Sequence, residues 1–89
     1  MRILIIEDDP KIAEFVRKGL KAEGFAVDHA ATGPEGLDLA LGASFDTLIV
    51  DVMLPVMDGI SVIEQVRKSN NNTPIIILSA RDRVEDRVK

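Results

Sequence analysis

The sequence predicts one α/β domain in which helices cover both faces of a parallel β-sheet. Two observations lead to this prediction. Four short apolar segments of strand length alternate with segments whose apolar residues recur at helical spacing, in the order βαβαβαβ, and the start of another helix follows. The segments 3–6 and 75–78 are uninterrupted apolar runs, which is typical of strands covered on both faces. Regular alternation of this kind favours a parallel sheet joined by right-handed crossovers.

The composition limits the classes of protein to be considered. The 89 residues form one small domain with a net charge of −4. Lys and Arg are scattered, without a basic patch, so we expect no direct nucleic-acid binding by this segment. The absence of cysteine excludes disulfides and thiolate metal sites. No apolar run approaches the roughly 20 residues of a membrane span, and the N-terminus turns acidic too early for a signal peptide. We therefore expect a cytoplasmic protein without membrane contact.

The first strand is predicted at 3–6 and ends in three consecutive acids at 7–9. Pro10 suits the first position of a helix, with Asp9 as its N-cap. Gly24 is expected to end this helix. The spacing i, i+3, i+4, i+7, i+8 predicts one apolar face, made of Ile12, Phe15, Val16, Gly19 and Leu20.

Residues 25–30 alternate and are more polar, which predicts an edge strand. His29, the only histidine, is interpreted as a partly exposed residue of that strand. A second helix is expected to begin at 32–34. Its inward-facing residues are predicted to be Leu37, Ala40 and Leu41.

The second half of the chain continues the alternation. The third strand is predicted at 45–51, and Asp58 is placed as the cap of a third helix with Ile63 and Val66 on one face. The fourth strand is predicted at 75–78 and interpreted as buried. Asp82 is expected to cap a last helix, of which 83–89 is present.

Polar groups follow three of the predicted strands: the acids at 7–9, Asp51 and Ser79. The carboxyl ends of parallel strands meet at one edge of the sheet. If the strand order is 2-1-3-4, the topological switch point lies between the first and third strands, where Glu7, Asp8 and Asp51 converge. Crowded carboxylates repel each other, and Mg²⁺, which prefers oxygen ligands, would relieve that repulsion.

A carboxylate beside Mg²⁺ can also act as a nucleophile and form an aspartyl-phosphate. Asp51 is the candidate for this role. The hydroxyl of Ser79, followed by the backbone N–H of Ala80, could hold a phosphoryl oxygen.

With these features together, the sequence resembles the response-regulator receiver domain (CheY-like) of two-component signalling. The resemblance is carried by ILIIEDD at the first strand end, by DVMLPVMDG at 51–59 and by Ser79-Ala80. The segment VEDRVK at 84–89 is similar to receivers attached to winged-helix DNA-binding domains. The resemblance implies a flavodoxin-like doubly wound sheet of strand order 2-1-3-4.

The resemblance also implies a role for each matching residue. Asp51 would accept a phosphoryl group from the phosphohistidine of a sensor histidine kinase. Asp8 and Asp51 would bind Mg²⁺ directly, Glu7 would act through water, and the backbone carbonyl of Met53 would complete the protein ligands.

Two further features of the family are the switch residues, which this sequence matches, and a lysine and an aromatic residue, which it does not match. Ser79 would be the switch hydroxyl, and the N–H of Ala80 would contact the phosphate. No residue matches the family's lysine and aromatic switch residue of the fifth strand, since Lys68 lies at a helix end and Lys89 comes too early. The resemblance therefore predicts that 1–89 is a receiver domain incomplete at its C-terminus, lacking the fifth strand, the fifth helix and an output domain for transcription.

Three other interpretations stay open. The chain could be a phosphorylation-incompetent fragment that mainly self-associates, as a homodimer or swapped dimer, through an exposed fourth strand. It could be a Mg²⁺-dependent aspartyl phosphatase, but that class needs a second carboxylate two residues after the nucleophile, where this chain has Met53. It could bind FMN, but the acidic first loop would repel a phosphate. We therefore favour a phosphoacceptor that is not an enzyme.

Overall fold

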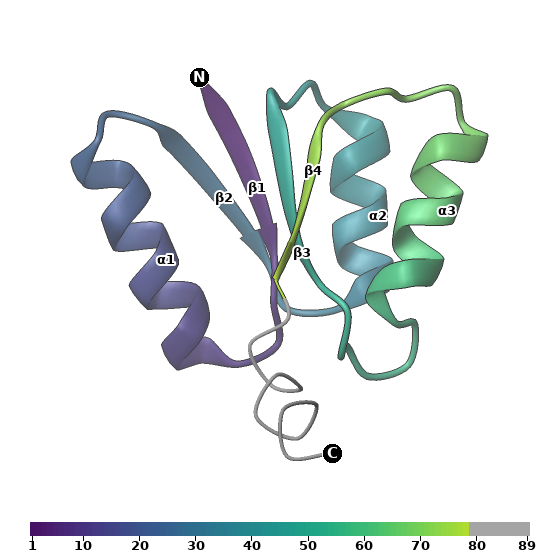
Figure 1. Cartoon of the computed structure of the whole chain (residues 1–89), viewed down its shortest axis with the longest axis horizontal. Coiled ribbons are helices and arrows are strands. Elements are labelled where there is room, and N and C mark those ends of the chain that lie inside the picture. The colour runs from purple at the N-terminus through teal and green to yellow at the C-terminus, as the bar shows by residue number, and fades with distance from the viewer. Residues whose placement is uncertain (79–89) are drawn as a thin grey trace, which may run out of the picture.

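The structure is a computed structural model and describes residues 1–78 (Figure 1). A four-stranded parallel sheet has the order β2-β1-β3-β4, and the predicted fold class and strand order are confirmed. The described strands and helices are β1 (Arg2–Ile6), α1 (Pro10–Ala22), β2 (Ala26–Ala30), α2 (Gly33–Gly42), β3 (Thr47–Asp51), α3 (Gly59–Lys68) and β4 (Ile75–Leu78). The predicted last helix lies outside the described residues.

Side-chain caps set the helix starts. The Asp9 carboxylate accepts hydrogen bonds from the backbone N–H groups of Lys11 and Ile12, at 2.9 and 3.3 Å. Thr32 and Asp58 cap α2 and α3 in the same way. These caps satisfy N–H groups that have no partner within the helix, so each helix begins where the sequence predicted.

The sheet separates two apolar clusters (Figure 1). On one face α2 and α3 cover the alternate strand residues, and on the other face α1 does so. The first cluster contains Leu4, Ile6, Leu48, Val50, Val62 and Val66, each at most 1% exposed. The second contains Ile3, Ile5 and Ile49, with Val16 and Leu20 of α1 packed against them.

Three residues predicted to lie on the inward face of a helix do not: Gly19, Phe15 and Leu41 are exposed. The side chain of Phe15 is 80% exposed and that of Leu41 is 46% exposed, so these predictions were wrong. In α1 the buried residue is Ala13, and Val16 and Leu20 pack on the sheet. Helical spacing defines neighbouring rows of residues, and the row that meets the sheet is the one next to Phe15.

The interpretation of the fourth strand as buried was also wrong. Ile76 and Ile77 are 56% and 51% exposed, although they point to opposite faces of the sheet. Among the described strands β4 pairs only with β3, so it forms an edge. Its residues therefore lack the second neighbour that buries those of β3.

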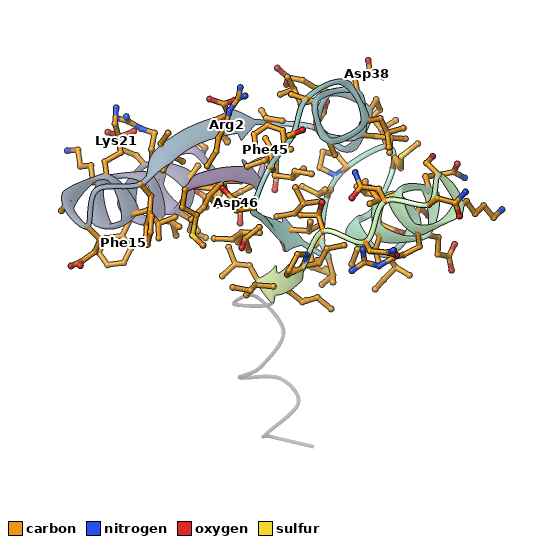
Figure 2. The ribbon with its side chains drawn as sticks, turned by 90° about the horizontal axis from the view of Figure 1, so that it is seen from above. Arg2, Phe15, Lys21, Asp38, Phe45 and Asp46 are labelled. Atoms are coloured by element: carbon orange, nitrogen blue, oxygen red, sulfur yellow. The ribbon has the colours of Figure 1, made fainter. Side chains whose placement is uncertain are left out.

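The amino end of the sheet is closed by a cluster around Arg2 (Figure 2). The backbone N–H of Arg2 donates to Asp46 at 2.7 Å, and its guanidinium lies 4.8 Å from the centre of the Phe45 ring. The guanidinium also donates to Asp28 of β2 at 2.6 Å. Phe45 is therefore buried just before β3 begins, although the sequence predicted it as part of the strand.

Within the described part of the chain, no helix has both the length and the apolar character needed to cross a membrane.

Candidate metal centre

Three carboxylates meet at the carboxyl end of the sheet. Glu7 and Asp8 directly follow β1, and Asp51 is the last residue of β3. Because β1 and β3 are adjacent and parallel, their ends lie side by side. One carboxylate oxygen from each of the three residues lies within 4.8 Å of the others. The convergence that the sequence predicted for these side chains is therefore present.

Burial and backbone hydrogen bonds hold two of these carboxylates in place. Glu7 is 1% exposed and Asp51 is 2% exposed. Oε2 of Glu7 accepts a hydrogen bond from the N–H of Asp9 at 2.9 Å, and Oδ1 of Asp51 accepts one from the N–H of Met53 at 2.9 Å. Asp8 is only partly buried, so it faces the opening of the site.

This set of ligand atoms fits a hard divalent cation. All three donors are carboxylate oxygens, which Mg²⁺ and Ca²⁺ prefer, and the described residues around them add no sulfur or imidazole ligand. Buried negative charges so close together are costly unless a cation neutralises them. Asp9 is excluded from this set because its carboxylate caps α1, as the sequence indicated.

The loop after Asp51 forms one wall of the site. An open pocket beside the acidic cluster is lined by Asp8, Val52, Met53, Leu54, Pro55, Asp58 and Ile60. Met53, predicted to offer its backbone carbonyl, lies in this wall with an exposed side chain. The site therefore has a polar floor and a largely apolar rim.

The loop has an unusual backbone at Val56. The N–H of Met57 donates to the carbonyl of Pro55 at 2.8 Å, which closes a three-residue turn, and Val56 has a φ of 69°. A β-branched residue in this region is strained by about 1–3 kcal/mol and persists only when its surroundings hold it. A Cβ on Gly59 would overlap the carbonyl oxygen of Asp51, so glycine is needed there for α3 to approach β3.

His29 makes a contact that the sequence analysis did not predict. Its Nε2 donates to the backbone carbonyl of Glu7 at 2.8 Å, while the N–H of Glu7 donates to the carbonyl of Ala30 at 3.0 Å. β2 thus holds the backbone of Glu7 on both sides. No side-chain pattern in the sequence indicated this contact, which depends on the sheet register that pairs Ile5 with His29 and so places the imidazole near the end of β1.

The remaining predicted site residues, Ser79 and Ala80, lie outside the described residues. β4 ends at Leu78, which is paired with Asp51 in the sheet.

Comparison with known proteins decides the family. The response regulator receiver domain family matches residues 3–89. The chain belongs to this family. A curated relative, the probable transcriptional regulatory protein SilR of Salmonella typhimurium, is 44% identical over 89 residues. That match covers 100% of this chain but only 39% of SilR.

Solved receiver structures share the fold. The receiver domain of the Francisella response regulator 1452 matches with a TM-score of 0.86 and 39% identity, over 98% of this chain and 72% of that one. TrrA from Thermotoga maritima, in complex with Mg²⁺ and BeF, matches with a TM-score of 0.85 and 32% identity, over 94% and 75%. TrrA in complex with the histidine kinase ThkA matches at 0.82 and 34%, over 89% and 68%.

Proposed function

We propose that this chain is the phosphoacceptor module of a two-component response regulator and that Asp51 takes the phosphoryl group. The observation that carries the proposal is the position of Asp51, 2% exposed at the end of β3, within 4.8 Å of the oxygens of Glu7 and Asp8. A nucleophilic carboxylate beside a set of oxygen ligands is the arrangement that aspartyl-phosphate chemistry requires.

Each residue of the site would have its own role in metal binding or phosphoryl transfer. Asp8 and Asp51 would hold Mg²⁺ directly and Glu7 through water, and the backbone carbonyl of Met53 would complete the protein ligands. When bound, Mg²⁺ neutralises charge on the transferring phosphoryl group. A carboxylate oxygen of Asp51 forms the new bond to phosphorus while the phosphorus–nitrogen bond of the donor breaks. Met53 donates its N–H to the other oxygen of Asp51 and keeps the nucleophile oriented.

The partners of similar proteins support a proposal for this chain. TrrA, a relative by structure, has been solved with a histidine kinase, and SilR is a probable transcriptional regulator. We propose a sensor histidine kinase as the donor and control of transcription as the output, through protein outside this chain. Ser79 and Ala80 belong to the proposal as contacts of the phosphoryl group. The position two residues after Asp51 is Met53, which does not suit an aspartyl phosphatase.

Phosphorylation is tested on the full-length protein with acetyl phosphate and Mg²⁺. We expect the wild type to gain one phosphoryl group, which adds about −1.5 to −2 charges at neutral pH. Asp51→Asn should gain none, because an amide is not a nucleophile here. Asp38→Asn, an exposed site on α2, is the control and should behave as the wild type. Intact-protein and peptide mass spectrometry locate the phosphoryl group. Finding it on a residue other than Asp51 would contradict the proposal.

Metal binding is tested by comparing two neighbouring acids. Asp8→Asn removes a proposed ligand and should weaken Mg²⁺ binding by roughly tenfold or more, which corresponds to about 1.4 kcal/mol. Asp9→Asn should change it little, because Asp9 caps α1 and asparagine caps a helix equally well. Isothermal titration calorimetry on both variants measures the difference. Equal losses would show that the ligands are misassigned.

A further inference from the structure

We infer that Gly33, the first residue of α2, is a positioning residue for the loop of residues 52–58 and thereby for the site around Asp51. This inference rests on the proposed function, because the loop carries Met53. Gly33 belongs to neither β3 nor the acidic cluster, and it acts through the space that its missing side chain leaves for the loop.

Gly33 is in direct contact with the loop. A Cβ at this position would overlap the backbone carbonyl oxygen of Met57 and would lie 3.0 Å from its Cβ. Gly33 is itself buried, so the loop backbone is pressed against the start of α2. A backbone carbonyl cannot rotate away as the end of a side chain can. Any side chain at residue 33 must therefore displace the loop or the helix.

Met57 is also the residue that closes the strained turn. Its N–H donates to the carbonyl of Pro55 and keeps Val56 at a φ of 69°. Its own carbonyl oxygen packs against Gly33. At the end of the loop, the N–H of Gly59 donates to the carbonyl of Val52 at 3.1 Å. Two glycines, one at the start of α2 and one at the start of α3, thus clamp the loop.

The clamp has a consequence for chemistry. The loop begins at Val52, directly after Asp51, and Met53 donates to the Asp51 carboxylate. A displacement at Met57 passes along a short and tightly bonded segment to these two groups. A misplacement of about 1 Å at a reacting centre can cost roughly 100-fold in rate. A change at residue 33 should therefore alter the site without touching it.

The test uses the full-length protein and three alanine variants. Gly33→Ala introduces the overlap. Gly42→Ala makes the same change in the same helix at a position with nothing within 4 Å, and Val66→Ala weakens the core at the far end of α3. For each variant we would measure the Mg²⁺ dissociation constant, the phosphorylation rate with acetyl phosphate, urea unfolding, and the amide NMR shifts of Met53 and Met57 without Mg²⁺.

We expect Gly33→Ala to weaken Mg²⁺ binding and to slow phosphorylation by between about threefold and 100-fold, with shifted Met53 and Met57 signals. Gly42→Ala and Val66→Ala should leave both constants within about twofold, although Val66→Ala lowers stability. Unchanged amide shifts and unchanged Mg²⁺ affinity in Gly33→Ala would overturn the inference. So would a loss in Val66→Ala that matches the loss in Gly33→Ala.

Val56→Gly gives an independent answer even if Gly33→Ala fails to fold. Glycine relaxes the turn but leaves both clamp contacts in place, so Mg²⁺ affinity should stay within about twofold of the wild type. A weakening as large as that expected for Gly33→Ala would mean that the turn, and not Gly33, holds the loop. If the wild type neither binds Mg²⁺ nor takes a phosphoryl group, the proposed function fails, while the metal-free amide shifts still test the clamp.

Discussion

Strands β3 and β4 are neighbours with similar sequences and very different surroundings. Ile49 of β3 pairs with Ile76 of β4, and Val50 pairs with Ile77. The β3 residues are 8% and 0% exposed, whereas their partners are 56% and 51% exposed. The difference cannot come from composition, since all four residues are β-branched and apolar. It comes from position, because β3 lies between two strands and β4 is the edge of the described sheet.

This contrast separates what a strand's own residues determine from what its neighbours determine. Apolar, β-branched residues favour a strand in both places. Burial depends on a second strand and on helices that pack across both faces. Asp51 has the same protected position: as the last residue of β3 it is 2% exposed, so its carboxylate lies in a site sheltered from solvent.

The largest difference in unfolding free energy is expected between alanine substitutions at Ile49 and at Ile76, which pair with each other across β3 and β4. Ile49→Ala should destabilise the fold by about 2–5 kcal/mol, because it leaves a cavity in a packed region. Ile76→Ala should cost less than about 1 kcal/mol, because half of this side chain is already in water. Urea unfolding of the 89-residue chain measures both values. Equal losses would mean that β4 is covered in solution.

The fold was largely predictable, because it depends on local patterns. The alternation of apolar segments predicted the parallel sheet, and the caps Asp9, Thr32 and Asp58 mark the helix starts. The exposure of Phe15 and Ile76 was not predictable from spacing. Spacing shows which residues share a face, but not how much of that face a neighbour covers.

The same division holds at the site. Glu7, Asp8 and Asp51 could be brought together from the sequence, because parallel strands align their carboxyl ends. The contact between Gly33 and Met57 could not, nor could the hydrogen bond from His29 to Glu7. Both involve backbone atoms of segments far apart in the chain, and no side-chain pattern records such contacts.

The next effect concerns the outer edge of β4, with which no strand of residues 1–78 pairs. The backbone N–H and C=O groups of such an edge are a template for another chain. We expect the 89-residue chain to form a dimer through this edge. Ile76→Lys should raise the dissociation constant on the order of tenfold, or about 1.4 kcal/mol. Ile60→Lys is the matched control, because Ile60 is an isoleucine of similar exposure, 48%, that belongs to α3 and not to β4.

Sedimentation equilibrium would measure this association, with circular dichroism on each variant to verify folding. A folded chain that stays monomeric at high concentration would refute the dimer. Equal weakening by both lysine variants would show that general charge repulsion, and not the β4 edge, controls association.

The smallest effect is expected at Phe15, which extends the comparison from a strand to a helix. A buried phenylalanine replaced by alanine costs about 3–5 kcal/mol. Phe15 is 80% exposed, and its ring lies on the outside of α1 (Figure 2). Phe15→Ala should therefore change the unfolding free energy by no more than about 0.5 kcal/mol, the range of ordinary surface substitutions. Alanine is also the better helix former, which favours the variant slightly.

Urea unfolding of the 89-residue chain at two protein concentrations tests this expectation. A loss above about 2 kcal/mol would show that the ring is covered in solution. If that loss grew with protein concentration, the cover would be a second copy of the chain, and α1 as well as β4 would belong to the contact.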